Sequence, residues 1–361
     1  MTSSRKHFKK GEVTEHYAKK PNGGGTFYLE SGPEDGPLVI FVHGWPELSV
    51  SWRHQLPVLG AMGFRAVAPD MPGYGRSDVY DTYEAYSLEN LVKEMMFLID
   101  ALGAEKAVWV GHDWGSMVVS AVASHHPERC LAVANLALPF FTGDLGLDGF
   151  VGTVDRSVYP ADKYPSGQWE YMNYYIENFE RANSAFDIDP ANSIKALFRS
   201  GDPSGVGKVA PSAEVRHNDG WFGQGRGAPD VPLDENVLSV EELHQYVSSL
   251  QKHGFFGPDA YYMNSERNEE FAKRMANGGY LDMPVLFVVA DYDFYCECNS
   301  SQLADQMRKR CRNLTAVSVE SSHWIAQEKP VEVNAALVHW LATEAKVWPK
   351  LAPPKWGAIK S

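Results

Sequence analysis

Short apolar runs alternate with helical periodicities along most of this 361-residue chain, and no other feature of the sequence restricts its fold as much. Runs typical of buried strands lie at 37–42, 65–69, 107–111 and 131–138. Between them, residues 87–103 repeat apolar side chains at the spacing of one helix face, with Ser87 placed to cap the start and Gly103 to end it. Strands separated by helices imply a mostly parallel sheet that is covered on both faces, so we expect an α/β fold.

The strand signal stops after Pro139 and resumes only at 284–290. Helical patterns fill the interval, at 168–182, 194–200, 240–254 and 261–278. The alternation then continues with a helix near 301–310, a strand at 314–320 and a helix at 331–345. We therefore predict a core domain from residues 1–140 and 282–361, with an inserted all-helical cap domain at 141–281.

One stretch inside this insertion carries little helical or strand signal. Residues 201–232 contain eleven Gly or Pro, a composition that favours a loop over a packed element. We interpret the stretch as a surface excursion, with a mobile lid as the alternative.

Charge and cysteine usage exclude several classes of function. The formal net charge of −13 argues against binding to nucleic acid or to an anionic membrane, because both require basic patches. No run of about 18 apolar residues indicates a membrane span. The four cysteines, Cys130, Cys296, Cys298 and Cys311, are too few and too irregular for a disulfide framework or a metal site, and they fit a reducing cytoplasm. The sequence calls for no cofactor and no metal, and it leaves a homodimer open.

The motif GHDWGSM places an acid where a strand turns sharply into a helix. Asp113 follows the strand at 107–111, and the small residues Gly111, Gly115 and Ser116 surround it. Such a turn lifts its central side chain out of the sheet and points the next backbone N–H, that of Trp114, into a site. The alternative role for Asp113 is that of a helix cap.

Three further candidates also follow strands, at the edge where ligands of parallel sheets bind. In HGWPE, the backbone N–H of Trp45 could be a second donor to an anion. His323 comes after the strand at 314–320, late in the chain, as the histidine of a hydrolase of this type should. Asp293, after the strand at 284–290, could orient that histidine, and Asp291 is its competitor.

A carboxylate nucleophile suits a saturated carbon that carries a leaving group. Its attack forms an ester, which water then hydrolyses at the carbonyl. An unperturbed Asp is ionised at pH 7, so His323 is free to activate the water. An epoxide oxygen leaves with a proton, which cap tyrosines could supply, whereas a halide needs only N–H donors such as Trp45 and Trp114. The tyrosine candidates are Tyr171, Tyr174, Tyr175, Tyr261 and Tyr262.

The chain resembles the hydrolase domain of soluble epoxide hydrolases, which have the α/β-hydrolase fold. The resemblance covers about residues 26–345 and rests on HGWPELSVSWRHQLPVL, MPGYGRSD, GHDWGSM, HGFFGPDAYYMNSERN and SHWIAQEKPVEVN. It implies a mechanism in which Asp113 is the nucleophile, His323 the base that activates water and Asp293 its orienting acid. Tyr262 matches the second proton-donating tyrosine of the family, and Tyr171 matches the first, with Tyr174 as the alternative.

The same resemblance implies that the Trp45–Pro46 peptide bond is cis. It predicts an apolar epoxide as substrate and a vicinal diol as product, with Pro46, Phe140 and Trp324 expected to contact the substrate. HGWP and GHDWG are shared with haloalkane dehalogenases, which are therefore the alternative. A non-catalytic binding protein of the same fold is disfavoured by the intact nucleophile, base and acid.

Overall fold

A sheet of eight strands runs through the part of the chain that the computed structural model describes, residues 11–21, 23–140 and 146–350. Its spatial order is β1-β2-β4-β3-β5-β6-β7-β8. The strands are β1 (Thr14–Lys19), β2 (Gly25–Ser31), β3 (Leu38–Val42), β4 (Arg65–Pro69), β5 (Ala107–His112), β6 (Cys130–Leu136), β7 (Leu281–Ala290) and β8 (Cys311–Val319). From β4 to β8 all neighbours pair in parallel, which confirms the predicted mostly parallel sheet.

The first two strands were not predicted. β1 pairs antiparallel with β2, and β2 pairs antiparallel with β4. β1 is almost entirely exposed, so its sequence TEHYAK lacks the apolar run by which the central strands were found.

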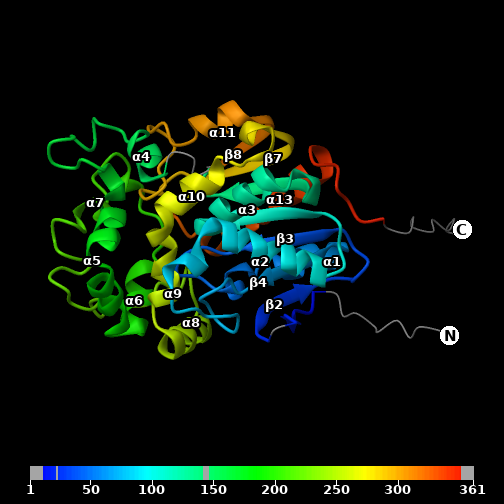
Figure 1. Cartoon of the computed structure of the whole chain (residues 1–361), viewed down its shortest axis with the longest axis horizontal. Coiled ribbons are helices and arrows are strands. Elements are labelled where there is room, and N and C mark those ends of the chain that lie inside the picture. Colours follow the sequence, from blue (N-terminus) through cyan, green and yellow to red (C-terminus); the bar gives the residue numbers. More distant parts are fainter. Residues whose placement is uncertain (1–10, 22, 141–145, 351–361) are drawn as a thin grey trace, which may run out of the picture.

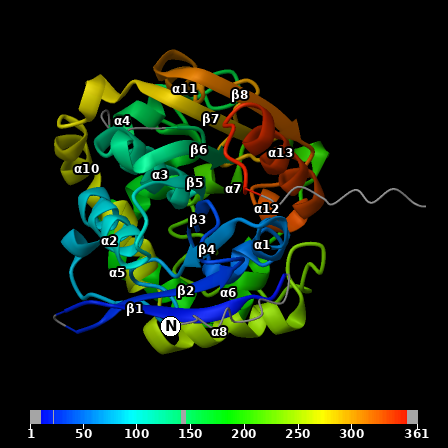
Figure 2. The ribbon, with the colours of Figure 1, turned by 90° about the vertical axis from the view of Figure 1, so that its right-hand side faces the viewer.

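Helices cover both faces of the sheet, as expected. Their bounds are α1 (Leu56–Met62), α2 (Leu88–Ala101), α3 (Trp114–His125), α11 (Asp305–Arg310), α12 (Ile325–Glu328) and α13 (Pro330–Thr343). Figure 2 shows α1 and α13 on one side of the strands, and α2 and α3 on the other. Successive residues of β3 follow this division, because Val39 and Phe41 pack with α1 and α13 whereas Ile40 and Val42 pack with α2 and α3.

The described residues between β6 and β7, 146–280, contain helices and no strand. We call these residues the cap. It comprises α4 (Gly146–Val151), α5 (Glu170–Asp187), α6 (Pro190–Leu197), α7 (Pro211–Glu214), α8 (Val240–His253), α9 (Phe256–Ala260) and α10 (Ser265–Ala272), with short 3-10 turns between them. In Figure 1 the cap, green to yellow, lies beside the sheet. The predicted boundary at residue 141 falls outside the described ranges.

Two expectations inside the cap need correction. The predicted helix at 261–278 is interrupted: a 3-10 turn, Tyr261–Asn264, precedes α10, and Asn277 and Gly278 adopt positive φ beyond it. The stretch 201–232 is mostly loop, but it is more than a surface excursion, because Ala213 is buried and Trp221 lines the main cavity. No helix in the described ranges is long and apolar enough to cross a membrane.

Candidate active site

Asp113 stands at a strained turn between β5 and α3. Its φ of 51° and ψ of −122° are unusual for a residue with a side chain, and its carboxylate makes no capping bond to α3. A Cβ at Gly115 would lie 2.0 Å from the Val42 carbonyl oxygen, and one at Gly111 would lie 2.3 Å from the Gly115 oxygen. Only glycine fits at both places, so the sequence of the motif forces the turn and turns the carboxylate away from the helix.

The loop after β3 meets this turn directly. The backbone N–H of Trp45 donates to Asp113 Oδ1 at 2.7 Å, and the Trp45–Pro46 bond is cis, as predicted. Trp114 is the first residue of α3, so its N–H has no partner within the helix. Two backbone donors therefore lie at the nucleophile, one of them already bound to it.

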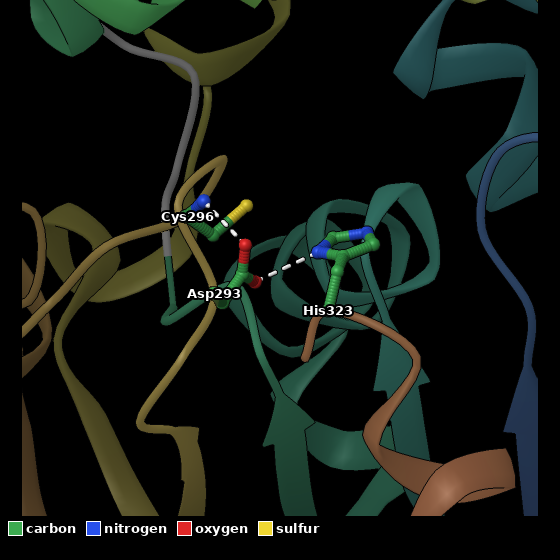
Figure 3. A group of neighbouring side chains, drawn as sticks. All are labelled: Asp293, Cys296 and His323. Atoms are coloured by element: carbon green, nitrogen blue, oxygen red, sulfur yellow. Dashed lines mark hydrogen bonds and ion pairs between the residues drawn. The ribbon is translucent and has the colours of Figure 1, made fainter. Parts of the chain in front are cut away.

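His323 links Asp113 to a second acid. Its Nε2 lies 3.5 Å from Asp113 Oδ2, and its Nδ1 lies 2.7 Å from Asp293 Oδ2 (Figure 3). Asp293 Oδ1 accepts the backbone N–H groups of Tyr295 at 2.8 Å and Cys296 at 3.0 Å. The structure brings the Asp293 carboxylate to the histidine, whereas Asp291 makes backbone hydrogen bonds to Val319 and Asn299.

The charges of this group stabilise one another. Burial lowers the pKa of His323, but the Asp293 carboxylate and the hydrogen bond to Asp113 outweigh burial and raise that pKa well above its usual value. Burial raises the pKa of Asp293, and the charge and hydrogen bond of His323 more than reverse this effect, so the pKa of Asp293 is lowered. The acid therefore stays ionised beside a histidine that can hold a proton.

A buried pair below the site was not predicted as functional. His112 Nδ1 lies 2.7 Å from Glu47 Oε2, and His112 Nε2 lies 2.7 Å from the His323 carbonyl oxygen. Both ring nitrogens thus lie within hydrogen-bonding distance of an oxygen, and His112 joins the loop after β3 to the backbone of His323. Burial raises the pKa of Glu47, but His112 lowers it to about 2. Glu47 lies in the motif HGWPE and His112 in the motif GHDWG, so these two motifs were the sequence signal that could have identified the pair.

Two cap tyrosines face Asp113 across the cavity. Tyr171 on α5 and Tyr262 line the cavity together with Asp113, and their ring centroids are 5.5 Å apart. Burial, with the charge of Asp113, raises the pKa of both well above 10. Tyr174 lies outside the cavity, and its hydroxyl donates to Asp219 at 3.3 Å. Tyr171 therefore lines the cavity that holds Asp113, and Tyr174 does not.

The cavity around these groups is mainly aromatic. Its lining residues are Trp45, Asp113, Trp114, Met117, Leu138, Phe150, Trp169, Tyr171, Met172, Leu197, Trp221, Tyr262, Tyr295, Cys296, His323 and Trp324. Of the three expected substrate contacts, Trp324 lines it. Pro46 and Phe140 do not, and Phe140 is fully buried in the core. Sequence reasoning missed Trp221, which comes from the loop 201–232, and Tyr295 and Cys296, which lie two and three residues after Asp293.

Asp293, Cys296 and His323 offer ligand atoms within 4.8 Å of one another, a spacing that a metal ion could use (Figure 3). The chemistry of the donors does not fit one. Metals bind the thiolate, whereas burial raises the pKa of Cys296 to about 12. The Asp293–His323 hydrogen bond already uses one donor and one acceptor of the group, so we interpret the pair as a histidine with its orienting acid.

Comparisons with known proteins agree with this geometry. The family described as alpha/beta hydrolase fold matches residues 37–330. Epoxide hydrolase A of Mycobacterium tuberculosis is 31% identical over 87% of this chain and 92% of its own length. Bifunctional epoxide hydrolase 2 of the mouse is 32% identical over 93% of this chain but only 56% of its own length, so the chain spans little more than half of that relative.

Solved structures give the same result. The crystal structure of epoxide hydrolase A from Mycobacterium thermoresistibile has a TM-score of 0.70 and 30% sequence identity, and the match covers 94% of this chain and all of that one. The similarities lend no support to the haloalkane dehalogenase alternative. The chain therefore belongs to the alpha/beta hydrolase fold family and, within it, to the epoxide hydrolases.

Proposed function

We propose that the protein hydrolyses an epoxide to a vicinal diol through an ester on Asp113. One observation carries the proposal: an ionisable carboxylate and two tyrosine hydroxyls face each other across a single apolar cavity. The carboxylate can attack a saturated carbon while the hydroxyls protonate the oxygen that leaves it.

In the first step Asp113 Oδ2 attacks one epoxide carbon, and the C–O bond of the ring breaks. Tyr171 and Tyr262 hold the ring oxygen and donate the proton that turns it into a hydroxyl. Because burial raises the pKa of both tyrosines, they keep their protons until the alkoxide forms and needs one.

In the second step water attacks the carboxyl carbon of the ester, and the Trp45 and Trp114 backbone N–H groups stabilise the oxyanion. His323 must be neutral to take the proton of this water. Formation of the ester favours this, because alkylation removes the negative charge of Asp113 that lay 3.5 Å from Nε2 and helped to raise the pKa of His323, and the tyrosinate left by the first step takes up the proton that His323 releases. Asp293 then holds the imidazolium that forms.

The structure argues against a halide as leaving group. The indole N–H of Trp45, one of its candidate donors, donates to Asp259 Oδ1 at 2.8 Å. The ring of Trp114, the other candidate, packs edge-on against that of Tyr262, with centroids 5.2 Å apart. The indole N–H of Trp45 is thus already bound, whereas the cavity places two tyrosines beside Asp113, as the protonation of an epoxide oxygen requires.

The substrate is a small molecule, and the aromatic lining of the cavity supports an apolar or aromatic epoxide. We further propose a cytoplasmic location, which the four buried free cysteines support. A homodimer, and the division into domains 1–140 with 282–361 and 141–281, remain predictions.

Isotope labelling tests the reaction. In a single turnover of styrene oxide in 18O water, the first diol should carry no label, and the label should appear in the carboxylate of Asp113. Label in the first diol with none in the protein would show that water attacks the epoxide directly. Parallel incubation with 1-bromobutane should release no bromide, and bromide without any diol would favour the dehalogenase.

A further inference from the structure

Asp259 is a fully buried carboxyl group between the cap and the core, and the proposed mechanism does not use it. Its Oδ1 accepts the indole N–H of Trp45 at 2.8 Å, and Asn183 Nδ2 lies 3.5 Å from its Oδ2. Tyr175, whose hydroxyl accepts the Trp221 indole N–H at 3.2 Å, is the third polar neighbour, and it lowers the pKa of Asp259. A single cap side chain thus gathers three polar groups behind the wall of the cavity.

Two of these neighbours lead directly to reacting groups. The backbone N–H of Trp45 binds the nucleophile Asp113. The ring of Tyr175 stacks on that of Tyr262, with centroids 4.9 Å apart and planes within 6°. Trp45 therefore connects Asp259 to an oxyanion donor in the core, and Tyr175 connects it to a proton donor in the cap.

The segment that carries Asp259 is fixed against the core. A Cβ at Gly257 would lie 2.7 Å from the Gly73 Cα, so the two backbones touch. The hydroxyl of Tyr261 donates to the Pro72 carbonyl oxygen at 2.8 Å. These contacts on both sides of Asp259 hold its carboxyl group at a set distance from the loop after β3.

We propose that Asp259 is a positioning residue, which holds the indole of Trp45 against Tyr175 and thereby sets Asp113 and Tyr262 across the cavity from each other. This role rests on the proposed function, because it concerns the geometry of that reaction. Asp259 touches no reacting atom itself.

The charge state of Asp259 gives the contact a measurable signature. Burial raises the pKa of Asp259 well above its usual value, and Asp187 on α5 raises it further, although Trp45, Asn183 and Tyr175 lower it. The folded state therefore binds a proton that the unfolded chain releases above about pH 3.9, so stability falls as pH rises from there to the folded pKa. Over that window the unfolding equilibrium constant of the wild type should rise about tenfold per pH unit relative to Asp259→Asn.

Paired substitutions test the positioning role. Asp259→Asn keeps an acceptor for the Trp45 indole, and kcat should stay within about threefold of the wild type. Asp259→Leu leaves that indole without a partner, and kcat should fall about 10- to 100-fold with little change in KM, the range for a buried donor that loses its acceptor. Trp45→Phe breaks the same contact from the core side, and the Trp45→Phe/Asp259→Leu double variant should be no worse than the poorer single variant.

The outcomes separate the two proposals. Unchanged kcat in Asp259→Leu, an equal loss in Asp259→Asn, or additive losses in the double variant would each overturn the positioning role. Should Asp259→Leu not fold, Trp45→Phe and Asp259→Asn decide the question. Should the wild type form no diol, the proposed function fails, while the pH dependence of unfolding in the wild type and Asp259→Asn still reports whether Asp259 is a buried neutral acid.

Discussion

The two halves of the active site are held in place by different means. On the core side, Asp113, His323 and Asp293 follow strands of one sheet. Backbone N–H groups bind the carboxylates of Asp113 and Asp293 at 2.7 to 3.0 Å. On the cap side, Tyr171 and Tyr262 are held mainly by aromatic neighbours, with rings 4.9 to 6.1 Å apart. The core half therefore depends on backbone geometry and charge, and the cap half on side-chain packing.

This difference implies different consequences of mutation. A change in the core half removes a chemical step, because no neighbour can replace a nucleophile or a base. A change in the cap half weakens a step that two hydroxyls share, or alters only the shape of the cavity. The predictions below follow this order, from loss of turnover to a change in apparent affinity.

The largest effect is expected from His323→Gln. The first step does not need the base, so the ester on Asp113 should form and persist, while multiple turnover falls by about 10⁴. Intact-protein mass spectrometry after incubation with styrene oxide should show the protein plus one epoxide. The His323→Gln/Asp113→Ala variant is the control and should show no adduct; an adduct there, or none in His323→Gln, would contradict the assignment.

A smaller loss is expected from Asp293→Asn, with Asp291→Asn as its matched control. The amide cannot hold the imidazolium of His323 by charge, so kcat should fall by about 10² to 10³. Removal of the anion also lowers the pKa of His323, so the acidic limb of the kcat profile should move to lower pH. Asp291→Asn should leave kcat and its pH profile unchanged. Equal effects of the two variants would contradict the assignment of Asp293 as the orienting acid.

The cap tyrosines should each matter less than any core residue. Tyr171→Phe and Tyr262→Phe should each lower kcat/KM about 10- to 100-fold, because the other hydroxyl still protonates the epoxide oxygen, and the double variant should lose more than either. Tyr174→Phe, three residues away on the same helix, is the control and should stay near the wild type. A large loss of kcat/KM in Tyr174→Phe would show that the proton donor had been assigned to the wrong tyrosine.

The same difference explains what the sequence could and could not predict. Strand ends are visible as apolar runs, and small residues around Asp113 mark the turn, so the parallel part of the sheet was predicted, and the sequence also indicated that Asp113, Asp293 and His323 would lie together at its edge. β1 was missed because its exposed sequence carries no apolar run, and β2 because its apolar run is only three residues long, 27–29. The helix at 261–278 was overextended because periodicity does not show where Asn277 and Gly278 turn the chain.

The cap half was less predictable because its geometry comes from contacts between distant segments. Tyr171 and Tyr174 lie within one helical turn, so spacing alone could not separate them, and it is the hydrogen bond of Tyr174 to Asp219 that shows which one leaves the cavity. Asp259 has no motif of its own, and its partners, Trp45 and Tyr175, are remote in sequence. Trp221 lay in a stretch whose Gly and Pro content indicated only a loop.

The smallest effect is expected where the cap supplies shape alone. Trp221 stacks against Trp45 with centroids 6.2 Å apart and lines the cavity without touching Asp113 or His323. Trp221→Ala should raise KM for styrene oxide about three- to tenfold, because apolar contact with the substrate is lost, and leave kcat nearly unchanged. Trp221→Phe keeps an aromatic wall and should recover most of the affinity. The indole N–H of Trp221 donates to the Tyr175 hydroxyl at 3.2 Å. A fall in kcat in both variants would mean that this hydrogen bond also aligns the proton-donating tyrosines. The loop 201–232 would then contribute to the chemical step and not only to the shape of the cavity.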